Sequence, residues 1–412
     1  MTGDPSSEYR PDSPLRGVRV LELTQYIAGP LAGQQLADFG ADVVKIERPD
    51  GGDPFRTYVG GKVIRNYGVN YRAYNRNKKS VVLDLQNPAA RDVFRRLAAD
   101  VDVVLENFRP GVMDRLGIGY EVLRASNPSL IYCSVAGFSD DGPYRDRPAF
   151  DTVGQALSGI LYTFVDPDQP KLRGPTLCDQ ATAFQASNAI MAALYGKRVS
   201  GVGARIDISM VDASVSFVPD FHSFYTDGGV AMEPDTRASV SQAFIMRCTD
   251  GMIAFQLAGL TRAWGGLCKA MGRPDVAEDP RFREREVRLG NWSELLDIMR
   301  PIFIERSRNY WEETLGAEGI PYAAVLSIPE AHEDPEIKHS GIFEQVQHPL
   351  AGPMTLMRRA ARINRSRGPQ QALPALLGEH THSVLSNVGY SREEIAALRA
   401  DGVIGAEAEL AC

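Results

Sequence analysis

The sequence predicts an α/β protein with a Rossmann-like, doubly wound large domain and a smaller α+β domain. Between Arg16 and Ala136, short β-rich segments alternate with segments of helical periodicity, which is typical of a parallel sheet covered by helices. Further along the chain, two β-rich segments flank Asp250-Gly251, a dipeptide typical of hairpin turns. The 412 residues are enough for two domains with separate cores.

The elements of the large domain are expected in close succession. A strand over 18–23 leads to a helix over 31–39, and Gly40 is expected to end it because glycine is favoured just beyond a helix. Pro88 opens another helix at a position where proline is tolerated. The remaining strands are expected at 43–46, 81–85, 101–105, 130–135 and 206–210, and helices at 89–98 and in the stretch up to Arg124.

A buried helix is expected to begin just after Asp179. Residues 181–194 are mostly Ala, with larger apolar residues at roughly helical spacing. The N–H groups and dipole of a first helical turn would favour an ionised Asp179. The pattern leaves two roles open for this residue, a helix N-cap and a nucleophilic carboxylate.

The second half of the chain changes character. A hairpin is expected from strands over 243–247 and 252–256. Helices are expected to open at Asn291 and near Ser307. Ser391 and Glu394 form a capping box ahead of a further helix.

Composition excludes several function classes. The net charge of −7 and pI near 5.5 argue against a nucleic-acid partner. The five cysteines include no CxxC pair, so we expect neither a disulfide framework nor a zinc site, and a reducing cytoplasm fits. Residues 1–14 are polar, unlike a signal peptide, and we expect a flexible tail; no apolar run is long enough to span a membrane.

A nicotinamide dehydrogenase is the obvious competitor for such a fold. Glu47 lies near the distance expected for an acid that binds the ribose. After the first expected strand, however, residues 24–30 contain one glycine where the dinucleotide fingerprint needs three. We therefore expect no NAD.

Four separated motifs carry a resemblance to a known family. They are LTQYIAGPLAGQQLADFGADVVKIERP from Leu23, NRNKKS from Asn75, ENFRPG from Glu106 and the segment around Asp179. In this order they resemble the class III coenzyme A transferases, the CaiB/BaiF type, which include a 2-methylacyl-CoA racemase branch. The similarity runs from about Leu15 to about Ile404.

The resemblance implies an organisation and a chemistry. It implies a large CoA-binding domain over 15–225 that carries the nucleophile and a return segment over 329–412 that completes it; between them, the hairpin and helix patterns predict a small α+β domain over 226–328. It also implies an interlocked, ring-like homodimer. CoA would be moved between an acyl-CoA and a small carboxylic acid without a metal or a redox cofactor.

The resemblance further assigns site residues. Asp179 falls where the transferases carry their nucleophile. Asp151 matches an acidic position that approaches it, with a helix N-cap as the alternative role of Asp151. The helix-start N–H groups would stabilise the oxyanion. The positions that match CoA-contacting motifs are Arg48, Tyr74, Asn75, Asn77, Asn107, Phe108, Arg109 and Arg115.

Two alternatives stay open. A racemase needs a second proton carrier, and the racemase branch has a His where this chain has Phe150; all six histidines lie at His222 or later. An acyl-CoA-binding protein without turnover would need only the CoA motifs, with Asp179 as a helix cap. Formyl-CoA transferase has a glutamine at the position of Ile27, which makes oxalate and formate doubtful substrates.

Overall fold

The computed structural model describes residues 10–58, 66–257 and 261–405. The chain divides into two compact units. The first comprises the described residues of 1–161, 174–218 and 340–412, and the second comprises those of 162–173 and 219–339.

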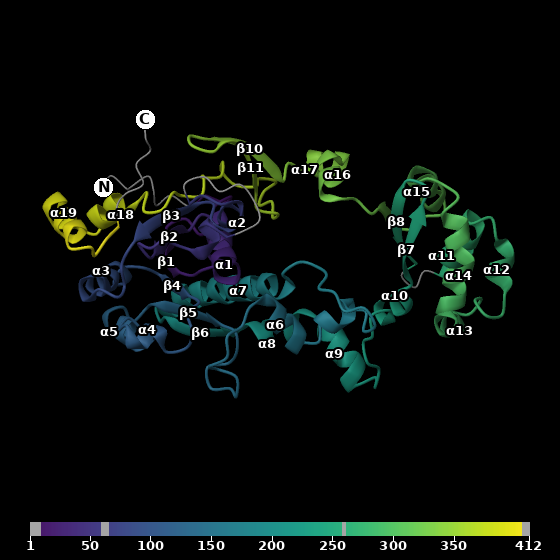
Figure 1. The fold of residues 1–412 in the computed structure, drawn as a ribbon, viewed down its shortest axis with the longest axis horizontal. Helices are drawn as coiled ribbons and strands as arrows, with labels where there is room; N and C mark the ends of the chain where they lie inside the picture. The colour runs from purple at the N-terminus through teal and green to yellow at the C-terminus, as the bar shows by residue number, and fades with distance from the viewer. Residues whose placement is uncertain (1–9, 59–65, 258–260, 406–412) are drawn as a thin grey trace. The chain divides into compact units, whose positions relative to one another are not determined.

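A six-stranded parallel sheet forms the centre of the first unit (Figure 1). Its strand order, β3-β2-β1-β4-β5-β6, is that of a Rossmann fold and confirms the predicted doubly wound architecture. The strands are β1 (Arg19–Leu23), β2 (Asp42–Glu47), β3 (Lys78–Val82), β4 (Val103–Glu106), β5 (Ile131–Ala136) and β6 (Ala204–Ser209).

Helices cover both faces of this sheet. On one face, α1 (Ala28–Asp38) and α7 (Leu177–Ser200) pack against each other and against alternate strand residues such as Val20 and Ile131. The neighbouring strand residues face a second core with α3 (Pro88–Ala98), α5 (Tyr120–Ser126), α18 (Thr381–Asn387) and α19 (Arg392–Ala400). The C-terminal helices, yellow in Figure 1, therefore complete the core of the first unit.

The predicted residues that begin or end these helices are confirmed. Gly40 follows α1 with φ of 100°, Pro88 opens α3 behind an Asn87 cap, and Ser391 forms a capping box with Glu394. The strand expected at 81–85 is wrong in position, because β3 begins at Lys78. Lys78 is 3% exposed although it is charged, so the apolar run marked only the second half of the strand.

Short elements connect the parts of the first unit. Their bounds are η2 (Pro54–Arg56), α2 (Val69–Tyr74), α4 (Val112–Arg115), α6 (Asp151–Leu157), α8 (Met210–Phe217), β10 (Phe343–His348) and β11 (Gly352–Met357). Of these, α6 and α8 pack against α7.

The second unit has its own antiparallel sheet of β7 (Ala243–Cys248), β8 (Gly251–Gln256) and β9 (Tyr322–Ala324). The predicted hairpin and the helix starts after Asn291 and Ser307 are confirmed. Its helices are α9 (Pro219–Thr226), α10 (Thr236–Ser241), α11 (Thr261–Ala270), α12 (Pro274–Glu278), α13 (Arg285–Gly290), α14 (Trp292–Phe303), α15 (Arg308–Ala317), α16 (Ile328–Glu333) and α17 (Pro335–Ser340). The short helix η3 (Leu161–Phe164) begins at the last residue of a segment of the first unit and continues in the second.

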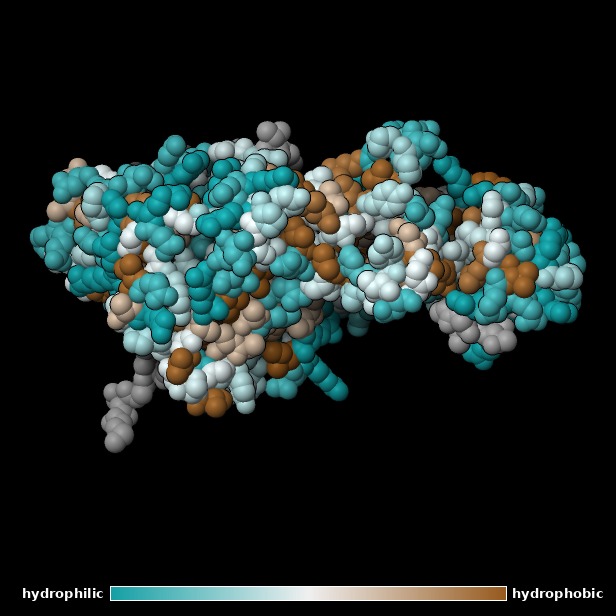
Figure 2. Space-filling view, turned by 90° about the horizontal axis from the view of Figure 1, so that it is seen from below, coloured by the Kyte–Doolittle hydropathy of each residue, from teal (hydrophilic) through white to brown (hydrophobic). Residues whose placement is uncertain are grey.

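Apolar side chains remain on the surface of the protein. Figure 2 shows brown apolar groups among teal polar residues on the face seen from below. On α7, Phe184, Tyr195 and Val199 are each at least half exposed. No helix in the described ranges is long and apolar enough to cross a membrane.

Candidate active site

Asp179 lies in the first turn of α7, at the carboxyl ends of the strands. The helix begins at Leu177, so the expectation that it begins after Asp179 is wrong. The preceding residue, Cys178, lies with its Sγ 3.4 Å from the carbonyl oxygen of Met210, which directly follows β6. Open parallel sheets bind their ligands at this edge.

Asp151, and not Asp179, caps α7. Its Oδ1 accepts hydrogen bonds from the backbone N–H groups of Cys178, at 2.9 Å, and Asp179, at 3.2 Å. Its Oδ2 accepts a bond of 2.6 Å from Nε2 of Gln155. The N-cap residue Thr176 makes no side-chain cap bond. The N-cap role considered for Asp179 is therefore wrong.

The same contacts change the expected oxyanion site. The N–H of Leu177 is bonded to the carbonyl of Pro175 at 2.9 Å, and the next two N–H groups are bonded to Asp151. The first three N–H groups of α7 are thus already bonded, and their role in stabilising an oxyanion stays a prediction. An oxyanion could reach these donors only after the Asp151 carboxylate has left them.

The environment of Asp179 favours its neutral form. Burial, followed by the nearby charge of Asp151, raises the pKa of the half-buried Asp179 carboxyl to about 7. A buried carboxyl group with a strongly perturbed pKa is a candidate for chemistry. Near neutral pH, both the protonated and the ionised form are populated.

Among the predicted CoA contacts, Tyr74 lies close to Asp179. It ends α2, and its side chain is hydrogen-bonded to that of Gln180. Burial, followed by the charge of Asp179, raises the pKa of its hydroxyl.

Three predicted contacts are engaged within the protein. Asn75 is fully buried, and its amide bonds the carbonyl of Tyr71 and the ammonium of Lys78. Asn77, with φ of 64°, bonds Asp38 and the segment at residues 371–372. Phe108 packs against the core on the α3 face of the sheet. These three side chains hold the scaffold together in this structure.

Asn107 fixes the loop after β1. Its amide exchanges two hydrogen bonds of 2.9 Å with the backbone N–H and carbonyl of Gln25. The next residue, Tyr26, has φ of 67°, and its N–H bonds Oδ1 of Asp53 at 3.2 Å. A non-glycine residue in this region is uncommon and is held in place by the surrounding contacts.

Arg48, Arg109 and Arg115 are exposed cations that follow the carboxyl ends of β2 and β4. Arg48 bonds the carbonyl of Gly52 through Nε, at 3.1 Å. Exposed guanidinium groups at this edge suit the phosphates of CoA.

Arg109 also lines a pocket of about 420 Å³ next to β4, β5 and β6. Five acidic residues line it together with Glu106, whose pKa burial raises to about 7. Glu106 accepts bonds from the N–H of Phe108 and the hydroxyl of Tyr132. Sequence reasoning did not single out this pocket.

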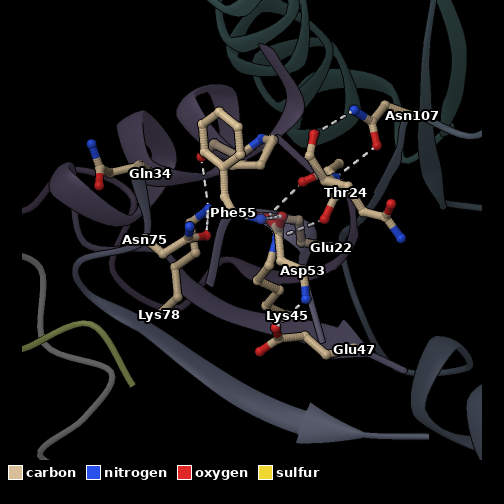
Figure 3. A network of polar contacts seen from close by, with 12 residues as sticks. Glu22, Thr24, Gln34, Lys45, Glu47, Asp53, Phe55, Asn75, Lys78 and Asn107 are labelled. Carbon is tan, nitrogen blue, oxygen red and sulfur yellow. Dashed lines mark hydrogen bonds and ion pairs between the residues drawn. The ribbon is translucent and has the colours of Figure 1, made fainter. Parts of the chain in front are cut away.

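A buried ion network lies beneath the loop after β1 (Figure 3). Lys45 from β2 lies 3.1 Å from Glu22 and 3.0 Å from Asp53, and Lys78 from β3 lies 2.8 Å from the same Glu22. All four side chains are at most 1% exposed. The sequence contained a sign of this network, because Glu22, Lys45 and Lys78 are charged residues within expected or adjoining apolar strand segments.

The buried carboxylate of Glu22 fits in this network only because a glycine lies next to it on α1. A Cβ on Gly33 of α1 would lie 1.9 Å from Oε2 of Glu22, so any larger residue would collide with the buried carboxylate. Thr24 donates its hydroxyl to Glu22 at 2.7 Å, and its carbonyl accepts from Lys45 at 2.6 Å. The ions thus hold the start of the loop that contains Tyr26.

Phe150 joins this loop to the carboxylate pair. Its ring meets Tyr26 edge to face at 5.3 Å between centroids, and it directly precedes Asp151. Phe150 is 60% exposed. A phenyl ring cannot carry a proton, so the position gives a racemase no second base.

No group of three or more His, Cys, Asp and Glu side chains within residues 10–58, 66–257 and 261–405 is placed to hold a metal ion.

Comparisons with known proteins agree with this geometry. The chain is 32% identical over 409 residues to the Homo sapiens succinyl-CoA:glutarate CoA-transferase, across 98% of this chain and 92% of the relative. It is 32% identical over 402 residues to the Chloroflexus aurantiacus succinyl-CoA–D-citramalate CoA-transferase, across 97% and 100% of the two chains. A crystal structure of a CaiB/BaiF family protein from Brucella suis matches with a TM-score of 0.81 and 28% identity, across 91% and 99% of the chains. The model of CoA-transferase family III matches residues 15–381. The chain belongs to CoA-transferase family III and is an enzyme of that class.

Proposed function

We propose that this enzyme transfers CoA from an acyl-CoA to a carboxylic acid through a covalent intermediate on Asp179. The observation that carries the proposal is the position of Asp179: half-buried in the first turn of α7, beside Asp151, with a pKa near neutrality. A nucleophilic carboxylate needs such a place, because a surface Asp would be solvated and its anhydride hydrolysed.

The proposed reaction consists of four acyl-transfer steps. The ionised Asp179 attacks the thioester carbonyl, the C–S bond breaks, and CoA thiolate leaves a mixed anhydride. The thiolate attacks the aspartyl carbonyl, which forms an aspartyl-CoA thioester and releases the donor carboxylate. The acceptor carboxylate attacks this thioester, giving a second anhydride and free thiolate. The thiolate then takes the acceptor acyl group and regenerates Asp179.

CoA itself is proposed to bind through the exposed Arg48, Arg109 and Arg115, with Tyr74 near the reacting thioester. Their exposure and their sequence positions after β2 and β4 support this role. We further propose a homodimer. The exposed apolar residues of α7 support it, because such residues on a soluble protein often mark an interface.

Hydroxylamine trapping tests the covalent step. Succinyl-CoA serves as donor, since both of the relatives described above carry it in their names. Incubation should leave a hydroxamate on the peptide that contains Asp179, seen by mass spectrometry. Asp179→Asn should abolish the product, whereas Asp92→Asn, which changes an exposed acid on α3, should not. Absence of any hydroxamate, together with normal acyl-CoA binding, would support a binding protein instead.

The racemase alternative gives a different isotope pattern. Thioester exchange never breaks the α C–H bond, so a 2-methylacyl-CoA in deuterated water should acquire no α-deuterium. Rapid deuteration that stops in Asp179→Ala would identify a racemase with a second base other than residue 150.

A further inference from the structure

Gln155 holds the capping carboxylate of the active site. It lies on α6 one turn after Asp151, and its side chain is 2% exposed. Its Nε2 donates to Oδ2 of Asp151 at 2.6 Å and to the carbonyl of Pro175 at 3.1 Å. Pro175 lies just before α7. One amide group therefore binds both the start of α6, through Asp151, and the segment that leads into α7.

The orientation of this amide follows from its neighbours. Both groups at the nitrogen end are acceptors, so that end has to be the donor. The Oε1 atom is buried, and no hydrogen-bond partner for it is found in the part of the chain that the structure describes. Buried polar atoms are nearly always paired, and Gln155 is an exception to this rule. Both N–H donors of its amide are used, whereas its acceptor oxygen has no partner within the described residues.

We infer that Gln155 is a positioning residue, which holds the Asp151 carboxylate against the first turn of α7 so that the nucleophile lies beside a fixed negative charge. The inference rests on the proposed function in that Asp179 is taken as the reacting group. Gln155 acts on the carboxyl group of Asp179 through Asp151, since the hydrogen bonds of its side-chain amide within the described residues are to Asp151 and Pro175.

Few other ionisable groups share this environment. The charge of Asp179 raises the pKa of Tyr74 on α2 and of Cys178 on α7, after burial in both cases. The only acid of α1, Asp38, is paired with Arg76. On α8, β5 and β6, the remaining groups are Asp212, Tyr132, Arg205 and Asp207, which line the acidic pocket, and the buried Cys133. Asp151 is therefore the principal charge that acts on Asp179.

The test reads the ionisation of Asp179 without any substrate. Asp179→Asn is introduced into four backgrounds: wild type, Gln155→Met, Asp151→Asn and the double variant. The change in midpoint temperature of unfolding that it causes is measured from about pH 4 to about pH 9. In wild type this change should grow with pH and level off near pH 7. In Gln155→Met it should level off about one pH unit lower, because Asp151 is no longer held beside Asp179.

The double variant distinguishes positioning from packing. In the Asp151→Asn background, Gln155→Met should leave the levelling-off pH unchanged. A pH unchanged by Gln155→Met in the wild-type background, or shifted equally in the Asp151→Asn background, would overturn the inference. If Gln155→Met does not fold, Gln155→Glu replaces it: its charge beside Asp151 should shift the levelling-off pH, and an unshifted value would overturn the inference. Because no turnover is measured, the result decides on the positioning role of Gln155 even if the protein proves to have no transferase activity.

Discussion

The backbone N–H of Asp179 donates to Oδ1 of Asp151 at 3.2 Å, so the second acid of the site binds the main chain of the first. A carboxylate bound in this way caps the helix and also places a negative charge next to the carboxyl group of Asp179. The two effects oppose each other for catalysis, because the charge that orders α7 also disfavours the ionised Asp179.

Transfer activity should therefore rise with pH through about 7. The pKa of Asp179 is raised to about 7, and in the proposed mechanism only the ionised carboxylate attacks the thioester. We expect kcat/KM for succinyl-CoA to fall about tenfold for each pH unit below that value. A pH series in buffers of constant ionic strength measures it. A flat profile down to pH 5 would contradict the assignment of Asp179 as the titrating nucleophile.

Replacing Asp179 should stabilise the protein at high pH. Its pKa is higher in the folded protein than the ordinary value of 3.8, so the folded state binds the extra proton and stability falls as pH rises from about 4 to about 7. Asp179→Asn removes this loss. We expect no gain near pH 4 and about 1–3 kcal/mol above pH 7, measured by denaturant unfolding. An equal gain at both pH values would indicate a different cause.

CoA affinity should depend on the exposed arginines. Arg48→Ala or Arg115→Ala should weaken CoA binding by about 1–3 kcal/mol, the range of a lost charge-assisted contact. Isothermal titration with CoA measures the change. Arg198→Ala, an exposed arginine in the last turn of α7, is the matched control and should bind normally. If all three variants bind CoA equally well, Arg48 and Arg115 are ordinary solvent-exposed residues with no role in CoA binding.

The buried ions should be far more important for stability than a comparable surface pair. Lys45→Met leaves Glu22 and Asp53 without this partner, and we expect a loss of about 3–5 kcal/mol. Lys79→Met removes the partner of Asp42, where both side chains are more than a third exposed, and should change stability by at most about 1 kcal/mol. Thermal and denaturant unfolding compare the two. Similar losses in both variants would contradict the proposed difference.

The sequence predicted the sheet and its helices well, because most strands are apolar runs bounded by glycine or proline. It misplaced β3, since Lys78 is charged and yet buried. Asp179 was identified through the family resemblance. Its cap could not be predicted, because Asp151 lies far along the chain and contacts α7 only once α6 has folded against it. Local capping rules search only neighbouring residues.

The amide bridge between Asn107 and Gln25 spans the gap between β4 and β1, where the strand order reverses. Rossmann folds that carry dinucleotides open their crevice at this reversal and receive the pyrophosphate there. In this protein a ligand would have to break two hydrogen bonds to enter it. The framework of a nucleotide-binding fold thus keeps two hydrogen bonds across its usual entrance. In the proposed function, the phosphates of CoA would meet the exposed arginines instead.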